Sequence, residues 1–120
     1  MDALRLASER RGPGLVVTVQ GDLDIVTSRQ FDDFLTQARR EQVSIVLDLS
    51  GVDFMDTSSL AVIVSHWKKL TSVGGTLALA GARYRYTKTL WITGLAHRLP
   101  LYDSAEEALQ ALAANTNQAS

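Results

Sequence analysis

The sequence predicts an α/β domain, a mixed β-sheet flanked by helices with its elements in the order ββαβαβαβα. Short β-branched runs alternate with stretches of helical period, and glycines stand where several of these elements end. Parallel strands need crossovers of about a dozen residues or more, which the helices would supply. A chain of 120 residues fits one domain, for which we expect residues 1–114, followed by a polar C-terminal tail over 115–120.

The N-terminal part predicts a hairpin followed by a helix. Leu4–Leu6 alternates apolar and polar residues, and after a charged turn containing glycine, Leu15–Val19 is β-branched. Gly21 is expected to end this second strand. From Ser28, apolar residues recur three and four positions apart, so we expect an amphipathic helix capped by Ser28 or Thr27.

The middle of the chain predicts the central strand and a second helix. Val43–Leu49 is short and too apolar for an edge strand, so we place it in the middle of the sheet with both faces covered. Asp53–Ser59 reads as a polar turn. Leu60–Leu70 has helical spacing and is followed by Gly74–Gly75, a pair that favours a helix stop.

The C-terminal part predicts two strands and two helices. Thr76–Gly81 alternates as a strand, and Tyr84–Ile92 is expected to be a helix. Leu99–Tyr102 contains a proline, which suits only an edge strand. Ser104–Glu107 is a capping-box pattern that opens a helix over Ala108–Ala113, and the polar tail beyond is expected to fray.

Composition excludes several classes of function. The chain is 46% hydrophobic and 21% charged, with a formal net charge of -1, so it lacks the basic face of a nucleic-acid binder. It has no cysteine for disulfides or thiolate metal sites. Neither a signal peptide nor an apolar run long enough to span a membrane is present. We therefore expect a cytoplasmic protein that binds no nucleic acid and inserts into no membrane.

The sequence contains no recognisable catalytic set. His66 and His97 lack the paired spacing of a zinc protease and have no third ligand marked nearby. A glycine-rich phosphate loop and a serine nucleophile elbow are both missing. We expect no catalytic residues, no metal and no cofactor, and a protein that is not an enzyme.

The informative stretch places three hydroxyl residues between a carboxylate and an apolar helix. Asp56 is followed by Thr57, Ser58 and Ser59, and the helix continues with Leu60. One interpretation is a capped helix start, because Asp, Ser and Thr satisfy the free backbone N–H groups there. The other is a functional turn that displays a hydroxyl group.

Two neighbouring features bear on that choice. In a sheet of this order, Asp22 and Asp24 in the turn after the second strand can lie near the start of the second helix. The alternative is an acidic turn that caps the first helix. Ala61 and Val62 give the second helix more apolar surface than one packed face requires, which indicates either a docking surface or deep burial.

The ordered set of motifs carries a family resemblance over nearly the whole chain. The motifs are Gly21–Asp24, Ile45–Ser50, Phe54–Ala61, Gly74–Gly75 before a strand, Thr93–Leu95 and Tyr102–Leu109. With them the chain resembles the STAS domain of bacterial anti-sigma factor antagonists, regulators that bind an anti-sigma kinase and so free a sigma factor. The resemblance implies a STAS-like fold.

The resemblance also implies a switch. In this family the hydroxyl residue after the aspartate is phosphorylated, which here is Thr57, with Ser58 as the alternative. The family usually has glycine where this chain has Ser59, and a side chain there can narrow the approach of a kinase or let Ser58 or Ser59 compete as acceptor. The implied partners are an anti-sigma factor kinase and a phosphatase acting on phosphorylated Thr57. The expected partner-binding residues are Asp22, Asp24, Asp56, Thr57, Ser58, Ser59, Ala61 and Val62.

A second function remains open. The same turn fits a STAS domain with a constitutive scaffold role, for instance as a subunit of a lipid-transporting ABC complex, in which Thr57 is never modified. The lead-in Phe54–Asp56 and the segment Ser104–Leu109 match the antagonists more closely.

Overall fold

The structure, a computed structural model, describes residues 4–83, 88 and 99–118. Its sheet has five strands in the order β1-β2-β3-β4-β5. β1 is antiparallel to β2, and the other neighbours are parallel, so the predicted mixed sheet is confirmed. The strands are β1 (Arg5–Arg11), β2 (Gly14–Leu23), β3 (Ser44–Met55), β4 (Thr76–Ala80) and β5 (Leu101–Tyr102).

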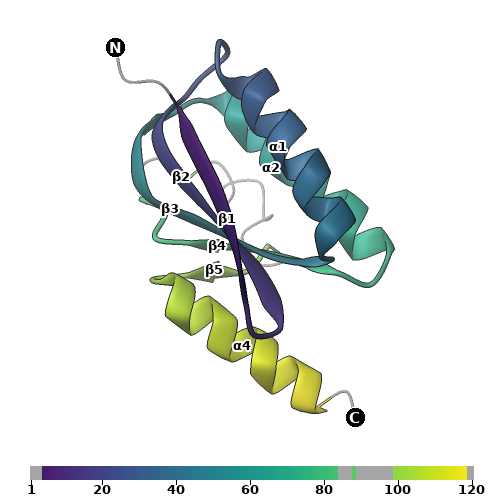
Figure 1. The fold of residues 1–120 in the computed structure, drawn as a ribbon. Helices are drawn as coiled ribbons and strands as arrows, with labels where there is room; N and C mark the ends of the chain where they lie inside the picture. Colours follow the sequence, from purple (N-terminus) through teal and green to yellow (C-terminus); the bar gives the residue numbers. More distant parts are fainter. Residues whose placement is uncertain (1–3, 84–87, 89–98, 119–120) are drawn as a thin grey trace.

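Helices cover both faces of the sheet. Helices α1 (Ser28–Glu41) and α2 (Thr57–Ser72) lie side by side on one face, and α4 (Ala105–Gln118) covers the other (Figure 1). On the central strand β3, Ile45 and Leu47 join the core under α1 and α2, and Val46 joins a smaller core under α4. All three are fully buried, as expected for a strand covered on both faces.

The hairpin is longer than the sequence pattern indicated. The ladder between β1 and β2 runs from Arg5 opposite Gln20 to Arg11 opposite Gly14, so residues expected to be a turn extend β1. Gly12 has a φ of 56°, which lets the chain reverse tightly. The prediction that Gly21 ends β2 is wrong, because the strand passes a register shift there and continues to Leu23.

The turn expected over Asp53–Ser59 is wrong at both of its ends. β3 continues to Met55 because its last residues pair with the end of β2, Phe54 opposite Asp22 and Met55 opposite Leu23. α2 then begins at Thr57, three residues earlier than expected. Only Asp56 remains between strand and helix.

The C-terminal segments follow the expected order with different bounds. Within the described residues, β5 pairs with β4 alone and forms an edge of the sheet. Pro100, which precedes β5, has no backbone N–H to donate, and an edge position tolerates this. The N–H of Glu107 donates to Ser104 Oγ over 3.2 Å, as expected of a cap. α4 continues to Gln118, so it is longer at both ends than the expected Ala108–Ala113. The helix expected over Tyr84–Ile92 lies outside the described residues, except for Lys88, which is helical.

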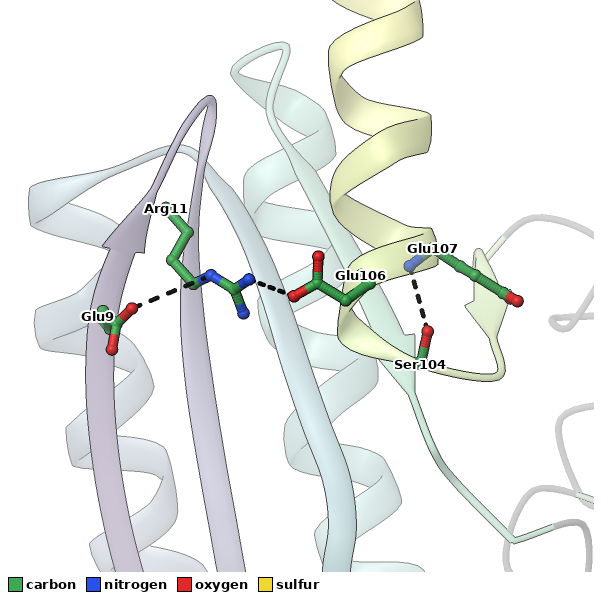
Figure 2. A network of polar contacts seen from close by, with 5 residues as sticks. All are labelled: Glu9, Arg11, Ser104, Glu106 and Glu107. Atoms are coloured by element: carbon green, nitrogen blue, oxygen red, sulfur yellow. Dashed lines mark hydrogen bonds and ion pairs between the residues drawn. The ribbon is translucent and has the colours of Figure 1, made fainter.

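A surface ion pair ties the hairpin to α4. The Arg11 guanidinium contacts the Glu106 carboxylate and lies 3.9 Å from Glu9 (Figure 2). Because these side chains are solvent-exposed, the pair orients the hairpin tip more than it stabilises the fold. Within the described segments, no helix is long and apolar enough to cross a membrane.

A buried histidine joins α1 to α2. The His66 side chain is only 1% exposed, and its Nε2–H donates to Asp32 Oδ1 over 2.6 Å. Its Nδ1 accepts a hydrogen bond from Arg39 Nε–H over 2.9 Å, which requires a neutral ring. Burial lowers the pKa of His66 below its ordinary value of 6.5, and the charges of Arg39 and Lys69 act in the same direction against the opposing effect of Asp32.

This arrangement predicts a loss of stability on mild acidification. A pKa that is lower in the folded than in the unfolded chain gives stability that is present above about pH 6.5 and is lost as the pH falls through the folded value. Denaturant unfolding between about pH 8 and pH 5.5 should show a decline that His66→Gln reduces, because Gln does not titrate. Parallel pH profiles for wild type and variant would contradict this.

Candidate functional site

Asp56 is the N-cap of α2 and the centre of the site. Its Oδ1 accepts hydrogen bonds from the Ser59 N–H over 3.2 Å, from Ser58 Oγ over 2.5 Å and from Ser59 Oγ over 3.4 Å. Partial burial acts to raise the pKa of Asp56. Hydrogen bonds from the Ser58 hydroxyl and from the backbone N–H groups of Ser59, Ser58 and Ile25 outweigh it and hold that pKa below its ordinary value. The group is therefore a stable carboxylate.

The three hydroxyl residues differ in access. Ser59 is fully buried, and Ser58 is half-buried with its hydroxyl directed at Asp56. Thr57, the first residue of α2, is exposed, and its hydroxyl makes no hydrogen bond within the described part of the chain. Of the three, Thr57 has the most exposed side chain. Ser59 is held by its hydrogen bonds to Asp56.

The loop between β2 and α1 lies against this helix start, as the sequence indicated. The Asp56 N–H donates to the Leu23 carbonyl over 3.0 Å, and the Ile25 N–H is one of the groups that lower the pKa of the Asp56 carboxylate. The hydrogen bond between Asp56 and Leu23 thus fixes the start of the loop beside the candidate switch.

Asp24, the acidic residue of the loop between β2 and α1, mainly organises that loop. Asp24 Oδ1 accepts from the N–H groups of Val26 and Thr27 over 2.9 and 3.0 Å. Thr27 Oγ1 donates to the Asp22 carbonyl over 2.9 Å. Thr27 occupies the N-cap position of α1, but its side chain makes no capping hydrogen bond. Asp24 therefore orders the turn that leads into α1.

The expected docking flank of α2 is divided. Ala61 is exposed, one turn beyond Thr57, whereas Val62 is half-buried and packs against the main core. Of the two apolar residues expected on this flank, Val62 thus contributes to the core and Ala61 remains on the surface.

The site also includes exposed apolar side chains that our sequence interpretation missed. Ile25 is 77% exposed, Val26 is 84% exposed and Phe54 is 47% exposed. Phe54 pairs with Asp22 across the ladder, so it lies at the same end of the sheet as the loop. The available signal was two β-branched apolar residues inside an otherwise polar loop, where no core face needs them.

The two segments that form the site carry only acidic charged residues, and the first basic residue after the loop is Arg29. Asp22, Asp24, Asp53 and Asp56 belong to the two segments that form the site, and neither 12–28 nor 43–67 contains lysine or arginine. The described residues hold no group of three or more side chains suited to a metal ion. The arrangement can present a hydroxyl to another protein's active site and can dock, since it combines an apolar tip with an acidic surround.

Comparison with known proteins gives the family of the chain. The STAS domain family matches residues 5–108. The anti-sigma F factor antagonist of Paenibacillus polymyxa is 33% identical over 113 residues, which covers 91% of this chain and 95% of the relative.

Solved structures share the fold. An anti-sigma factor antagonist from Mycobacterium paratuberculosis superposes with a TM-score of 0.81 at 24% identity, over 92% of this chain and 94% of that one. The Bacillus cell fate determinant SpoIIAA in its phosphorylated form gives 0.72 at 20% identity, over 92% and 99%. With a family match over most of its length and a relative of this similarity, the chain belongs to the STAS domain family.

Proposed function

We propose that this chain is an anti-sigma factor antagonist: it binds an anti-sigma factor of the serine/threonine kinase type and so releases a sigma factor, under the control of phosphorylation at Thr57. The observation that carries the proposal is the exposed Thr57 hydroxyl beside two serines that are both tied to Asp56. The kinship with a protein named as an anti-sigma F factor antagonist supports the choice of partner.

The helix start tolerates a phosphate without neutralising it. The backbone N–H groups and the dipole of α2 stabilise an anion placed there by at most about 2 kcal/mol. A phosphothreonine carries about -1.5 to -2 charges. Unit charges of like sign about 6 Å apart repel by roughly 3 kcal/mol at an effective dielectric of about 20. Beside the Asp56 carboxylate, the added charge therefore changes the docking surface while the fold persists.

The partner supplies the chemistry. A kinase that transfers a phosphate to Thr57 holds nucleotide phosphates opposite the hydroxyl. After transfer, the phosphothreonine faces those like charges and must also be desolvated in the interface, so the complex weakens. A phosphatase would restore the binding form. We place this exchange in the cytoplasm, where the sequence predicts the protein to reside.

The first prediction concerns the acceptor. Incubation with anti-sigma kinases of the same genome and ATP, followed by mass mapping, should place the phosphate on Thr57. Thr57→Ala should abolish labelling, whereas Ser58→Ala and Ser59→Ala should retain it. Thr71→Ala, at an exposed threonine near the other end of α2, is the matched control. Binding without any phosphorylation would instead support the constitutive scaffold.

The second prediction separates stability from switching. Because Asp56 rather than Thr57 is the N-cap, Thr57→Ala should cost less than the roughly 1 kcal/mol of a lost cap and should leave partner binding intact. Thr57→Asp should weaken binding, since it adds negative charge beside Asp56, although less than a phosphate does. Titration calorimetry checks both. Equal affinities of the two variants would remove Thr57 from the switch.

The third prediction concerns activity. The chain should neither hydrolyse ATP nor bind it at micromolar concentration, since its sequence lacks a phosphate loop and a catalytic set. Calorimetry with ATP should show no saturable heat. Micromolar binding that a substitution in this chain abolishes would overturn the non-enzymatic assignment.

A further inference from the structure

The most exposed large apolar side chains of the described chain stand at the tip of the loop between β2 and α1. Ile25 and Val26 are 77% and 84% exposed, more than Val73 at 66% or Val43 at 43% near the opposite end of the sheet. Placing two adjacent β-branched side chains in water contributes nothing to the core. Surface apolar groups of this kind act as anchors when a partner buries them.

The loop that carries them is ordered before any partner arrives. Asp24 Oδ1 accepts from the N–H groups of Val26 and Thr27, and Thr27 Oγ1 accepts from the Asp24 N–H over 3.0 Å. Ser28 Oγ donates to the Ile25 carbonyl over 3.1 Å. Because the tip is held by hydrogen bonds on both sides, it loses little conformational entropy on binding. Little of the free energy from burying its apolar side chains is then offset by ordering the loop.

The tip is also joined to the candidate switch. The Asp56 N–H donates to the carbonyl of Leu23, where β2 ends, over 3.0 Å, and the Ile25 N–H helps to lower the pKa of the Asp56 carboxylate that caps α2. Thr57 directly follows Asp56, so the apolar tip and the proposed phosphorylation site are both connected to Asp56.

The surroundings define the chemistry of that partner. The carboxylates of Asp22, Asp24 and Asp56 come from the same two segments, which contain no lysine or arginine. A complementary surface needs an apolar pocket for the tip and basic side chains at its rim.

We propose that Ile25 and Val26 form the apolar anchor by which this domain docks into a pocket of its protein partner, a pocket that is rimmed by lysine and arginine. The inference rests on the proposed function, because the partner is the anti-sigma factor kinase proposed above. The inference adds to that function the residues that contribute most of the binding energy and the chemistry of the partner surface that binds them.

Two equivalent valine substitutions test the anchor. The probe is the anti-sigma kinase of the same genome that phosphorylates the wild-type chain, and the measurement is its Kd by calorimetry. Val26→Ser should weaken binding by about tenfold or more, from the lost burial of one valine side chain. Val73→Ser, at an exposed valine next to the C-terminal end of α2, should change the Kd by less than about twofold.

The outcomes separate the anchor from the proposed function. If no kinase binds or phosphorylates the wild type, the proposed function fails and the anchor with it. If the kinase binds and labels Thr57 but Val26→Ser binds as wild type does, or if Val73→Ser weakens binding equally, the anchor is wrong and the function stands. Unchanged circular dichroism of both variants confirms that they fold.

Ionic strength tests the rim. Raising NaCl from about 0.05 to about 0.5 M should weaken wild-type binding, since screening reduces attraction between the acidic surround and a basic rim. An affinity that stays constant or rises with salt would overturn the basic rim.

Discussion

The Asp56 carboxylate is the interaction on which the rest of the site depends. It caps α2, accepts hydrogen bonds from the hydroxyl groups of Ser58 and Ser59, and has its pKa lowered in part by the Ile25 N–H of the neighbouring loop. Each contact satisfies a polar group that would otherwise be left unpaired at a helix start or in a loop. Because these donors converge on one side chain, Thr57 is left as the hydroxyl that faces outward.

The sheet places this carboxylate by extending the ladder between β2 and β3 to the last residues of both strands. The final residues of β3 pair with the end of β2, and Leu23, Val52 and Met55 there still belong to the main core. This ladder fixes the distance between the first loop and the start of α2, so one aspartate can serve both. The segments that carry the apolar tip and the exposed Thr57, about thirty residues apart in the chain, are thereby joined at Leu23 and Asp56.

Local patterns predicted the parts of the fold that depend on local physics. The apolar run Val43–Leu49 indicated a central strand, and Ser104 indicated a cap, because burial and capping leave periodic or positional signals. The far ends of β1 and β3 were missed, since polar residues there are held by cross-strand pairing that the sequence does not display. The role of Asp24 within its own loop, and the exposure of Ile25 and Val26, likewise follow from tertiary placement.

The central claim is that Asp56 holds both the helix start and the loop, and amide hydrogen exchange tests it most directly. In wild type the N–H groups of Ile25 and Ser59 should be protected, and Asp56→Ala should expose both together. The Val73 N–H, bonded to the Leu70 carbonyl at the other end of α2, should be unchanged. Loss of protection at Ser59 with Ile25 still protected would contradict the account.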